Sequence, residues 1–131
     1  MPLPVPCRVL VVDDHPDAAG SLAQVIEMQG HQAVYLTDPT TVEHVVKDFE
    51  PHIVLLDITM PGIDGWTLGR KLRELEGGKT LKLVAVTALS HPEARAASRK
   101  AGFDAHLAKP IDPKMIPALL DQFFSEEIRL R

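Results

Sequence analysis

The sequence predicts an α/β fold: a doubly wound five-stranded parallel sheet in the order 2-1-3-4-5, with helices on both faces. Apolar strand-like runs alternate five times with amphipathic helical stretches, the pattern of right-handed strand-helix-strand units. The first, third and fourth runs are apolar nearly throughout, as in central strands that helices cover on both faces. For five such strands, 2-1-3-4-5 is the common open arrangement.

Strands are expected at residues 8–12, 33–36, 53–56, 81–86 and 105–107. The second run mixes polar and apolar residues from His31 to Tyr35, which favours an edge position. Helices are expected between the strands and after the last one, because apolar residues recur there at helical spacing. The residues expected to be buried on them are Leu22, Val25, Ile26, Val42, Val45, Val46, Phe49, Leu68, Leu72, Leu75, Ile116, Leu119, Leu120, Phe123 and Phe124.

Local signals mark several ends of these helices. Gly30 ends the first helix, and Asp38-Pro39 can begin the second with a cap followed by proline. Ser90-His91-Pro92-Glu93 has the capping-box pattern and opens the fourth helix, which Gly102 closes. Asp112-Pro113 is expected to start the fifth.

The chain of 131 residues fits one domain, and its hydrophobic fraction of 45% is enough for an interior. We expect a tail at residues 1–7, a domain at 8–125 and a second tail at 126–131. The net charge of −4 offers no attraction to a polyanion, so nucleic-acid binding is disfavoured. Cys7 is the only cysteine, which excludes an internal disulfide and suits a reducing compartment.

Residues 1–7 lack the basic start and the apolar stretch of a signal peptide. No apolar run approaches the ~20 residues that span a bilayer. The sequence therefore predicts a cytoplasmic protein without a membrane partner.

Charged side chains directly follow three of the predicted strands. Asp13-Asp14 follow the first, Asp57 follows the third and Lys109 follows the fifth, while Thr87 ends the fourth. The carboxyl ends of parallel strands share one edge, and the predicted order places strands one and three together at its switch point. Three carboxylates at this edge would repel one another, which would raise the pKa of at least one of them unless a cation neutralises their charge. Mg²⁺ suits such oxygen ligands, and a carboxylate beside it can attack phosphorus to form an acyl phosphate.

A purely structural interpretation is open for some of these residues. Asp13 and Asp14 could be a helix N-cap and a first-turn charge, and Thr87 could be a β-branched residue that closes a strand. Capping accounts for one of the two aspartates. It does not account for Asp57 and Lys109 at neighbouring strand ends.

Four motifs, in this order, resemble those of response-regulator receiver domains of two-component signalling, the CheY-like proteins with a flavodoxin-like fold. They are Val11-Val12-Asp13-Asp14, the run from Leu55 to Gly65, Val86-Thr87-Ala88 and Ala108-Lys109-Pro110. Each motif alone is weak, whereas all four at these spacings are very specific. The resemblance covers about residues 8–125.

The resemblance implies that Asp57 is the phosphoacceptor and that Mg²⁺ is the cofactor. The implied metal ligands are Asp14, Asp57, the carbonyl of Thr59 and, directly or through water, Asp13. The implied binding groups for the phosphoryl oxygens are Thr87, the amide of Ala88 and Lys109. The Lys109-Pro110 bond would be cis, which sequence alone would predict in only ~5–6% of cases.

The implied partners are a histidine kinase or histidine phosphotransfer protein as donor, and a downstream protein target. Such a chain is not an enzyme in the usual sense, because it assists only its own phosphorylation and dephosphorylation. In this family the face formed by helix four, strand five and helix five meets partners, and helix four carries Arg95, Arg99 and Lys100. Because the chain ends soon after helix five, we expect its output to be protein contact or onward transfer.

Two positions depart from the family's pattern. Three residues before the lysine, the family usually has Tyr or Phe, whose ring moves inward when the threonine is drawn to the phosphate; here the residue is His106. Its imidazole could follow the same motion as a weaker or pH-sensitive switch, or it could be half-exposed without a role. Leu89 stands where some relatives carry an acid or amide that orients water, so we expect slow self-dephosphorylation.

Two other classes of protein are alternatives to a receiver domain. A Mg²⁺-dependent phosphatase with an aspartyl-phosphate intermediate also combines Asp, Thr and Lys, but its nucleophile follows the first strand and its acidic pair comes late. A flavin-binding electron carrier is excluded, because the acidic loop from Asp13 to Asp17 would repel a phosphate group. His15 is disfavoured as a metal ligand, since imidazole suits zinc better than magnesium.

Overall fold

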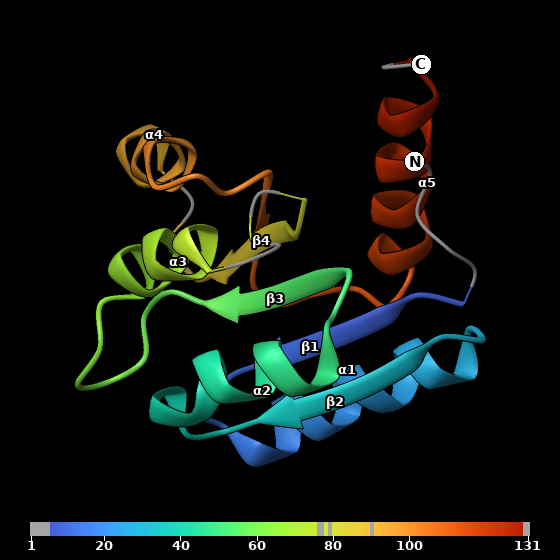
Figure 1. Cartoon of the computed structure of the whole chain (residues 1–131), viewed down its shortest axis with the longest axis horizontal. Coiled ribbons are helices and arrows are strands. Elements are labelled where there is room, and N and C mark those ends of the chain that lie inside the picture. The colour runs from blue at the N-terminus through green and yellow to red at the C-terminus, as the bar shows by residue number, and fades with distance from the viewer. Residues whose placement is uncertain (1–5, 76–77, 79, 90, 130–131) are drawn as a thin grey trace.

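The computed structural model describes residues 6–75, 78, 80–89 and 91–129, with backbone only for 124–129. It confirms the predicted parallel sheet, in the order β2-β1-β3-β4-β5 (Figure 1). The strands are β1 (Arg8–Val12), β2 (Gln32–Leu36), β3 (Ile53–Asp57), β4 (Lys82–Thr87) and β5 (Ala105–Ala108). The helices are α1 (Pro16–Met28), α2 (Val42–Phe49), α3 (Gly65–Glu74), α4 (Pro92–Lys100) and α5 (Met115–Arg129).

Two hydrophobic clusters lie on opposite faces of the sheet, because successive side chains of a strand point to opposite sides. Val9 and Val11 of β1 join the cluster that α1 and α5 cover. Leu10 and Val12 join the other cluster, which contains residues of α2 and α3. The central strands are therefore buried on both faces, as predicted, and β2 is the more exposed edge strand.

Three helix starts differ from the sequence prediction. Asp38 caps a 3-10 turn, Pro39–Thr41, that precedes α2, and not the α-helix itself. The cap of α4 is His91, whose Nδ1 accepts from the amide of Ala94, while Ser90 lies outside the described residues. The fifth helix begins at Met115 because the side chain of Asp112 accepts from the amide of Lys114 and forms a separate turn.

The structured part of the chain extends beyond both expected boundaries of the domain. Cys7, at the end of the expected N-terminal tail, is buried in the cluster under α1 and α5. Helix α5 continues to Arg129, past the expected boundary at residue 125. Residues 1–5 and 130–131 of the two expected tails lie outside the described residues, as does the side chain of Phe124.

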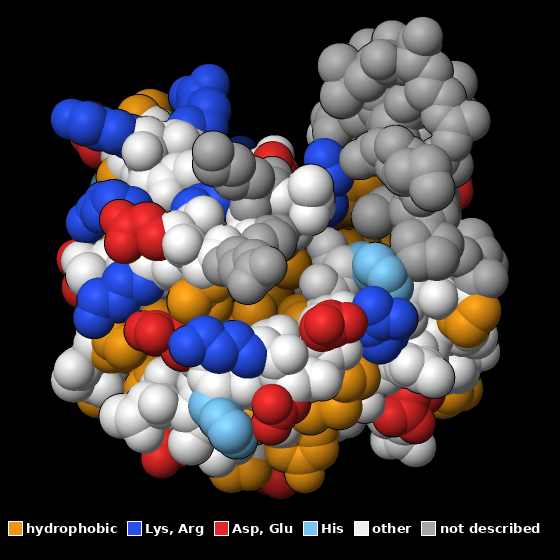
Figure 2. Space-filling model, viewed as in Figure 1, with side chains coloured by type: hydrophobic (Ala, Val, Ile, Leu, Met, Phe, Trp, Pro, Cys, Tyr) orange, Lys and Arg blue, Asp and Glu red, His pale blue; other side chains and the backbone are white. Residues whose placement is uncertain are grey.

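Charged side chains are spread over the face seen in Figure 2, with lysines and arginines gathered over α3 and α4. The last turns of α3 and α4 carry the basic residues Lys71, Arg73, Arg99 and Lys100. Within the described residues, none of the helices combines the length and apolar character needed to cross a membrane.

Candidate functional site

Three polar side chains are buried at the carboxyl ends of β1, β3 and β4. Asp57 is the last residue of β3 and is 2% exposed, and Asp13, directly after β1, is 7% exposed. Thr87 ends β4 and is fully buried. The sheet brings them together because neighbouring parallel strands end at one edge. Buried carboxylates are costly unless a cation pairs with them.

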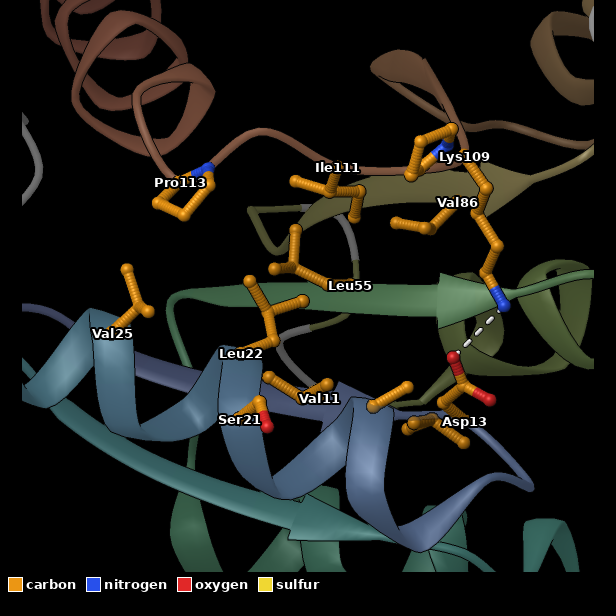
Figure 3. A pocket seen from close by; sticks show the side chains of 13 residues that line it. Val11, Asp13, Ser21, Leu22, Val25, Leu55, Val86, Lys109, Ile111 and Pro113 are labelled. Atoms are coloured by element: carbon orange, nitrogen blue, oxygen red, sulfur yellow. Dashed lines mark hydrogen bonds and ion pairs between the residues drawn. The ribbon is translucent and has the colours of Figure 1, made fainter.

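Lys109, directly after β5, is that cation. Its Nζ lies 2.9 Å from Oδ2 of Asp13 and 2.9 Å from Oδ2 of Asp57, and the first contact is the dashed line in Figure 3. Burial disfavours the charge on Lys109, yet its hydrogen bonds to the two carboxylates raise its pKa above the ordinary value. Burial also disfavours ionised Asp13, but hydrogen bonds from the His15 amide and from Lys109 lower its pKa. Both groups are therefore charged at neutral pH.

The other oxygen of Asp57 is held by the loop that follows β3. The amide and the hydroxyl of Thr59 lie 2.9 and 2.8 Å from Oδ1 of Asp57. The carboxylate is thus fixed between Thr59 at one oxygen and Lys109 at the other. A carboxylate held in one orientation is prepared for attack on a correctly placed partner.

The acidic pair after β1 forms a small cluster with the next residue. Asp13, Asp14 and His15 each place one potential ligand atom within 4.8 Å of the others. Nδ1 of His15 lies 3.2 Å from Oδ1 of both aspartates. Asp57, the third expected carboxylate, is linked to Asp13 through the Lys109 ammonium. The carboxylate oxygens fit a hard cation such as Mg²⁺, whereas imidazole suits softer metals.

The remaining predicted residues lie at the end of β4 and on the loops after β4 and β5. The hydroxyl oxygen of Thr87 accepts from the amide of Leu89 at 3.0 Å, and Ala88 between them is exposed. The amide of Lys109 donates to the carbonyl of Thr87 at 2.9 Å, which anchors the lysine to the end of β4. The Lys109–Pro110 peptide bond is cis, as expected.

His106 contacts the loop after β4. Its Nε2 lies 2.8 Å from the carbonyl oxygen of Leu89, and its Nδ1 lies 3.2 Å from Oγ of Ser98 on α4. Ser98, only 1% exposed, is also bonded to Nε1 of Trp66 at 3.0 Å. Sequence reasoning missed Ser98, because a serine among charged residues of a polar helix gives no sign of burial.

A cavity of about 510 Å³ borders the site between α1 and the loop after β5 (Figure 3). The Asp13–Lys109 pair lies at one end of it. Apolar side chains make up most of the remaining wall, including Val11, Leu22, Val25, Leu55, Val86 and Ile111. Apolar surroundings strengthen the attraction between the two charges, because they lower the local dielectric constant.

Comparison with known proteins gives one consistent result. The response regulator receiver domain family matches residues 9–121. An uncharacterized 14.6 kDa protein of Leptolyngbya boryana is 35% identical over 117 residues, which are 88% of each chain. The sensor histidine kinase RcsC of Escherichia coli is 33% identical over 121 residues, 92% of this chain but only 12% of the kinase.

Solved structures agree with the sequence matches. A putative response regulator from Chloroflexus aurantiacus has a TM-score of 0.83 at 28% identity, covering 92% of this chain and 98% of that one. A CheY-like receiver domain protein from Methanospirillum hungatei has a TM-score of 0.84 at 25% identity, covering 95% and 98%.

The matched family consists of signalling domains of two-component systems, not of conventional enzymes. The chain belongs to the response regulator receiver domain family. Receiver domains generally bind Mg²⁺ at an acidic pocket, and the cluster of Asp13, Asp14 and His15 lies at the corresponding edge of this sheet.

Proposed function

We propose that the protein is a phosphorylation-controlled switch that accepts a phosphoryl group on Asp57. The donor is the phosphohistidine of a histidine kinase or histidine phosphotransfer protein in the cytoplasm. The observation that carries this proposal is the pair of 2.9 Å contacts from Lys109 to Asp57 and Asp13 at the buried carboxyl edge of the sheet.

In the transfer step, a carboxylate oxygen of Asp57 attacks phosphorus. A P–O bond forms while the P–N bond to the donor breaks, and the electron pair of that bond leaves with the donor imidazole. Lys109 then shifts from the carboxylate to an oxygen of the phosphoryl group, where its positive charge offsets the added negative charge. The hydroxyl of Thr87 and the amide of Ala88 bind the other phosphoryl oxygens.

The oxygen-rich end of β1 would hold Mg²⁺. The residues that would hold the ion are Asp14 and Asp57 through their side chains and Thr59 through its carbonyl, with Asp13 contributing directly or through water. When bound, the ion supplies positive charge beside the carboxylate and the incoming phosphoryl oxygens. The protein's part is to hold the carboxylates at the strand ends and to bring Lys109 to the same place.

The experiment is incubation with acetyl phosphate and Mg²⁺, followed by intact mass measurement. Wild type should gain one phosphoryl group and Asp57→Asn should gain none. Asp48→Asn, at an exposed site on α2, is the matched control and should react like wild type. Uptake by Asp57→Asn, or none by wild type, would overturn the proposal.

The signal leaves through a protein partner. The surface around α4 carries Arg95, Arg99 and Lys100. It lies next to β5, the strand that contains His106. Affinity capture with phosphorylated and unmodified protein should retain different partners. The phosphatase alternative has no support from the family match, and catalytic turnover of a phosphomonoester would be needed to revive it.

A further inference from the structure

A second cavity, of about 550 Å³, lies at the amino ends of three strands, on the edge of the sheet opposite Asp57. Among the residues that line it, Arg8 begins β1, His52 directly precedes β3, and Leu81 directly precedes β4. Its volume is within the range of sites that bind small molecules in proteins. A ligand in this cavity, here called the Arg8 cavity, would leave the acidic edge of the sheet unoccupied.

Part of the wall of the Arg8 cavity is apolar. Pro51 and Leu81 contribute buried side chains, and Val46 and Leu75 contribute half-buried ones. Small-molecule sites typically combine such a wall with a few polar groups that fix the orientation of the ligand. The wall therefore suits a ligand with an apolar body.

Arg8 supplies hydrogen-bond donors to the same cavity. Its Nε donates to the carbonyl oxygens of Phe49 and Glu50 at 3.1 and 2.8 Å, which satisfies the end of α2. A guanidinium has five N–H groups, and Nε accounts for one of them. Among the residues that the structure describes, the terminal nitrogens of Arg8 have no hydrogen-bond or ion-pair partner. Their planar arrangement suits a carboxylate, which can accept two parallel bonds.

His52 supplies a further donor. Its Nδ1 accepts from the amide of Arg8 at 2.9 Å, so the neutral imidazole carries its proton on Nε2. Its own amide donates to the carbonyl of Arg8 at 2.8 Å, which fixes the residue beside β1. Within the described part of the chain Nε2 has no partner, and it is not buried. It can therefore donate to a ligand in the cavity.

The charges around the Arg8 cavity favour an anion with a single charge. Arg8 and Lys47 line it with two positive charges, and Glu50 lines it with one negative charge. This local balance is positive although the chain as a whole carries −4. Lys47 is exposed in the last turn of α2 and, among the described residues, its ammonium has no partner. A monoanion would neutralise the excess charge, whereas a dianion would exceed it.

We propose that the Arg8 cavity binds a small carboxylate with an apolar body. The carboxylate accepts hydrogen bonds from the terminal nitrogens of Arg8 and pairs with the ammonium of Lys47, while the body lies against the apolar wall. This inference goes beyond the proposed function and does not depend on it, because none of the groups involved belongs to the acidic edge of the sheet.

The test titrates the full chain, unphosphorylated and at fixed ionic strength, with benzoate as the probe, and measures affinity by calorimetry. Lys47→Gln should bind benzoate about fivefold more weakly than wild type, and Glu50→Gln about fivefold more tightly, since each removes one charge near the carboxylate. Both positions are exposed, so neither variant should fail to fold. Lys114→Gln, an exposed lysine outside the cavity, should bind like wild type.

His52 provides a second measurement that a purely structural role would not affect. Burial, and secondarily the charge of Arg8, lowers the pKa of His52. A carboxylate bound to Arg8 offsets that charge and favours the protonated imidazole, so saturating benzoate should raise the pKa of His52. NMR titration measures this pKa, and the signals of His52 are identified by their absence in His52→Asn. Benzyl alcohol, similar in size but uncharged, should not raise it.

Three results would each overturn the proposal. They are an unchanged pKa of His52 in the presence of benzoate, an equal response to benzoate and benzyl alcohol, and wild-type affinity in both Lys47→Gln and Glu50→Gln. The same measurements on Asp57→Asn should match those on wild type. The outcome is therefore separate from the question whether Asp57 accepts a phosphoryl group.

Discussion

Lys109 reaches from the end of β5 across β4 to Asp57 on β3, with 2.9 Å between Nζ and Oδ2. The same ammonium lies 2.9 Å from Oδ2 of Asp13. One cation thus bridges two buried carboxylates that would otherwise repel each other. The bridge supplies part of the charge neutralisation that we assign to Mg²⁺, so the lysine and the ion compete for the same carboxylates.

This competition predicts that Lys109→Met binds Mg²⁺ more tightly than wild type. Loss of one neighbouring positive charge should strengthen binding by about tenfold, in keeping with charge interactions near a protein surface. Phosphoryl uptake should fall, because nothing replaces the ammonium at the phosphoryl oxygens. Calorimetric titration with Mg²⁺ checks the affinity, and Lys114→Met, at an exposed position, is the control. Equal affinity in all three proteins would refute the competition.

Leu89 is expected to make the acyl phosphate long-lived. The amide of Leu89 donates to the hydroxyl oxygen of Thr87, and Leu89 is 37% exposed. An apolar side chain therefore occupies the position beside the site from which an acid or an amide could orient water. Leu89→Glu should shorten the phosphoryl lifetime by about tenfold or more, since a positioned base assists attack by water. Intact mass followed over time checks this, with the exposed Met28→Glu as control. A wild-type half-life of seconds at neutral pH would contradict it.

The site residues on strand ends could be predicted from the sequence. A charged residue at the end of a buried parallel strand lies at the carboxyl edge of the sheet, as Asp57 does after the third apolar run. The same reasoning places Asp13 and Lys109 at this edge. Ser98 could not be predicted, because its two partners come from α3 and β5 and only the packing of α4 joins them.

The residue at which each helix begins was also difficult to predict from the sequence, for a related reason. Asp38 and Asp112 do accept hydrogen bonds from amides two residues later, as their side chains favour. In both places the turn that results is separate from the α-helix that follows. A local pattern identifies the turn but not the residue at which α-helical geometry begins.

Gly65→Ala tests how closely α3 approaches the loop after β3. The added Cβ would lie 2.4 Å from the Cα of Ile58, a backbone atom next to Asp57 that cannot move alone. We expect a loss of about 1–3 kcal/mol in the free energy of unfolding, together with slower phosphoryl uptake. In Gly20→Ala, by contrast, the nearest atom is 3.6 Å away in Tyr35, so this change within α1 should stabilise by about 0.5–1 kcal/mol. Chemical denaturation measures the unfolding free energy of both variants. An unchanged value for Gly65→Ala would show that α3 and the loop after β3 are not closely packed at this point.

Two histidines hold the amino end of β1, opposite the site. Nδ1 of His52 accepts from the amide of Arg8 at 2.9 Å, and Nδ1 of His31 accepts from the amide of Cys7 at 2.9 Å. An imidazole that accepts through Nδ1 cannot carry a proton there. Burial, and secondarily the charge of Arg8, lowers the pKa of His52 below its ordinary value.

The lowered pKa of His52 predicts that acid destabilises the fold through this residue. The unfolded chain takes up the proton near the ordinary histidine pKa of about 6.5, whereas the folded protein takes it up only at lower pH. The contribution of His52 to stability is therefore complete above that value, decreases as pH falls below it, and stops changing once pH is below the folded pKa.

His52→Asn keeps an acceptor oxygen near the Arg8 amide but does not titrate, so its unfolding free energy should fall less than that of wild type between pH 7 and 5. His44→Asn, exposed on α2, should follow the wild-type curve. Equal slopes for wild type and His52→Asn in chemical denaturation at a series of pH values would show that protonation of His52 is not coupled to folding.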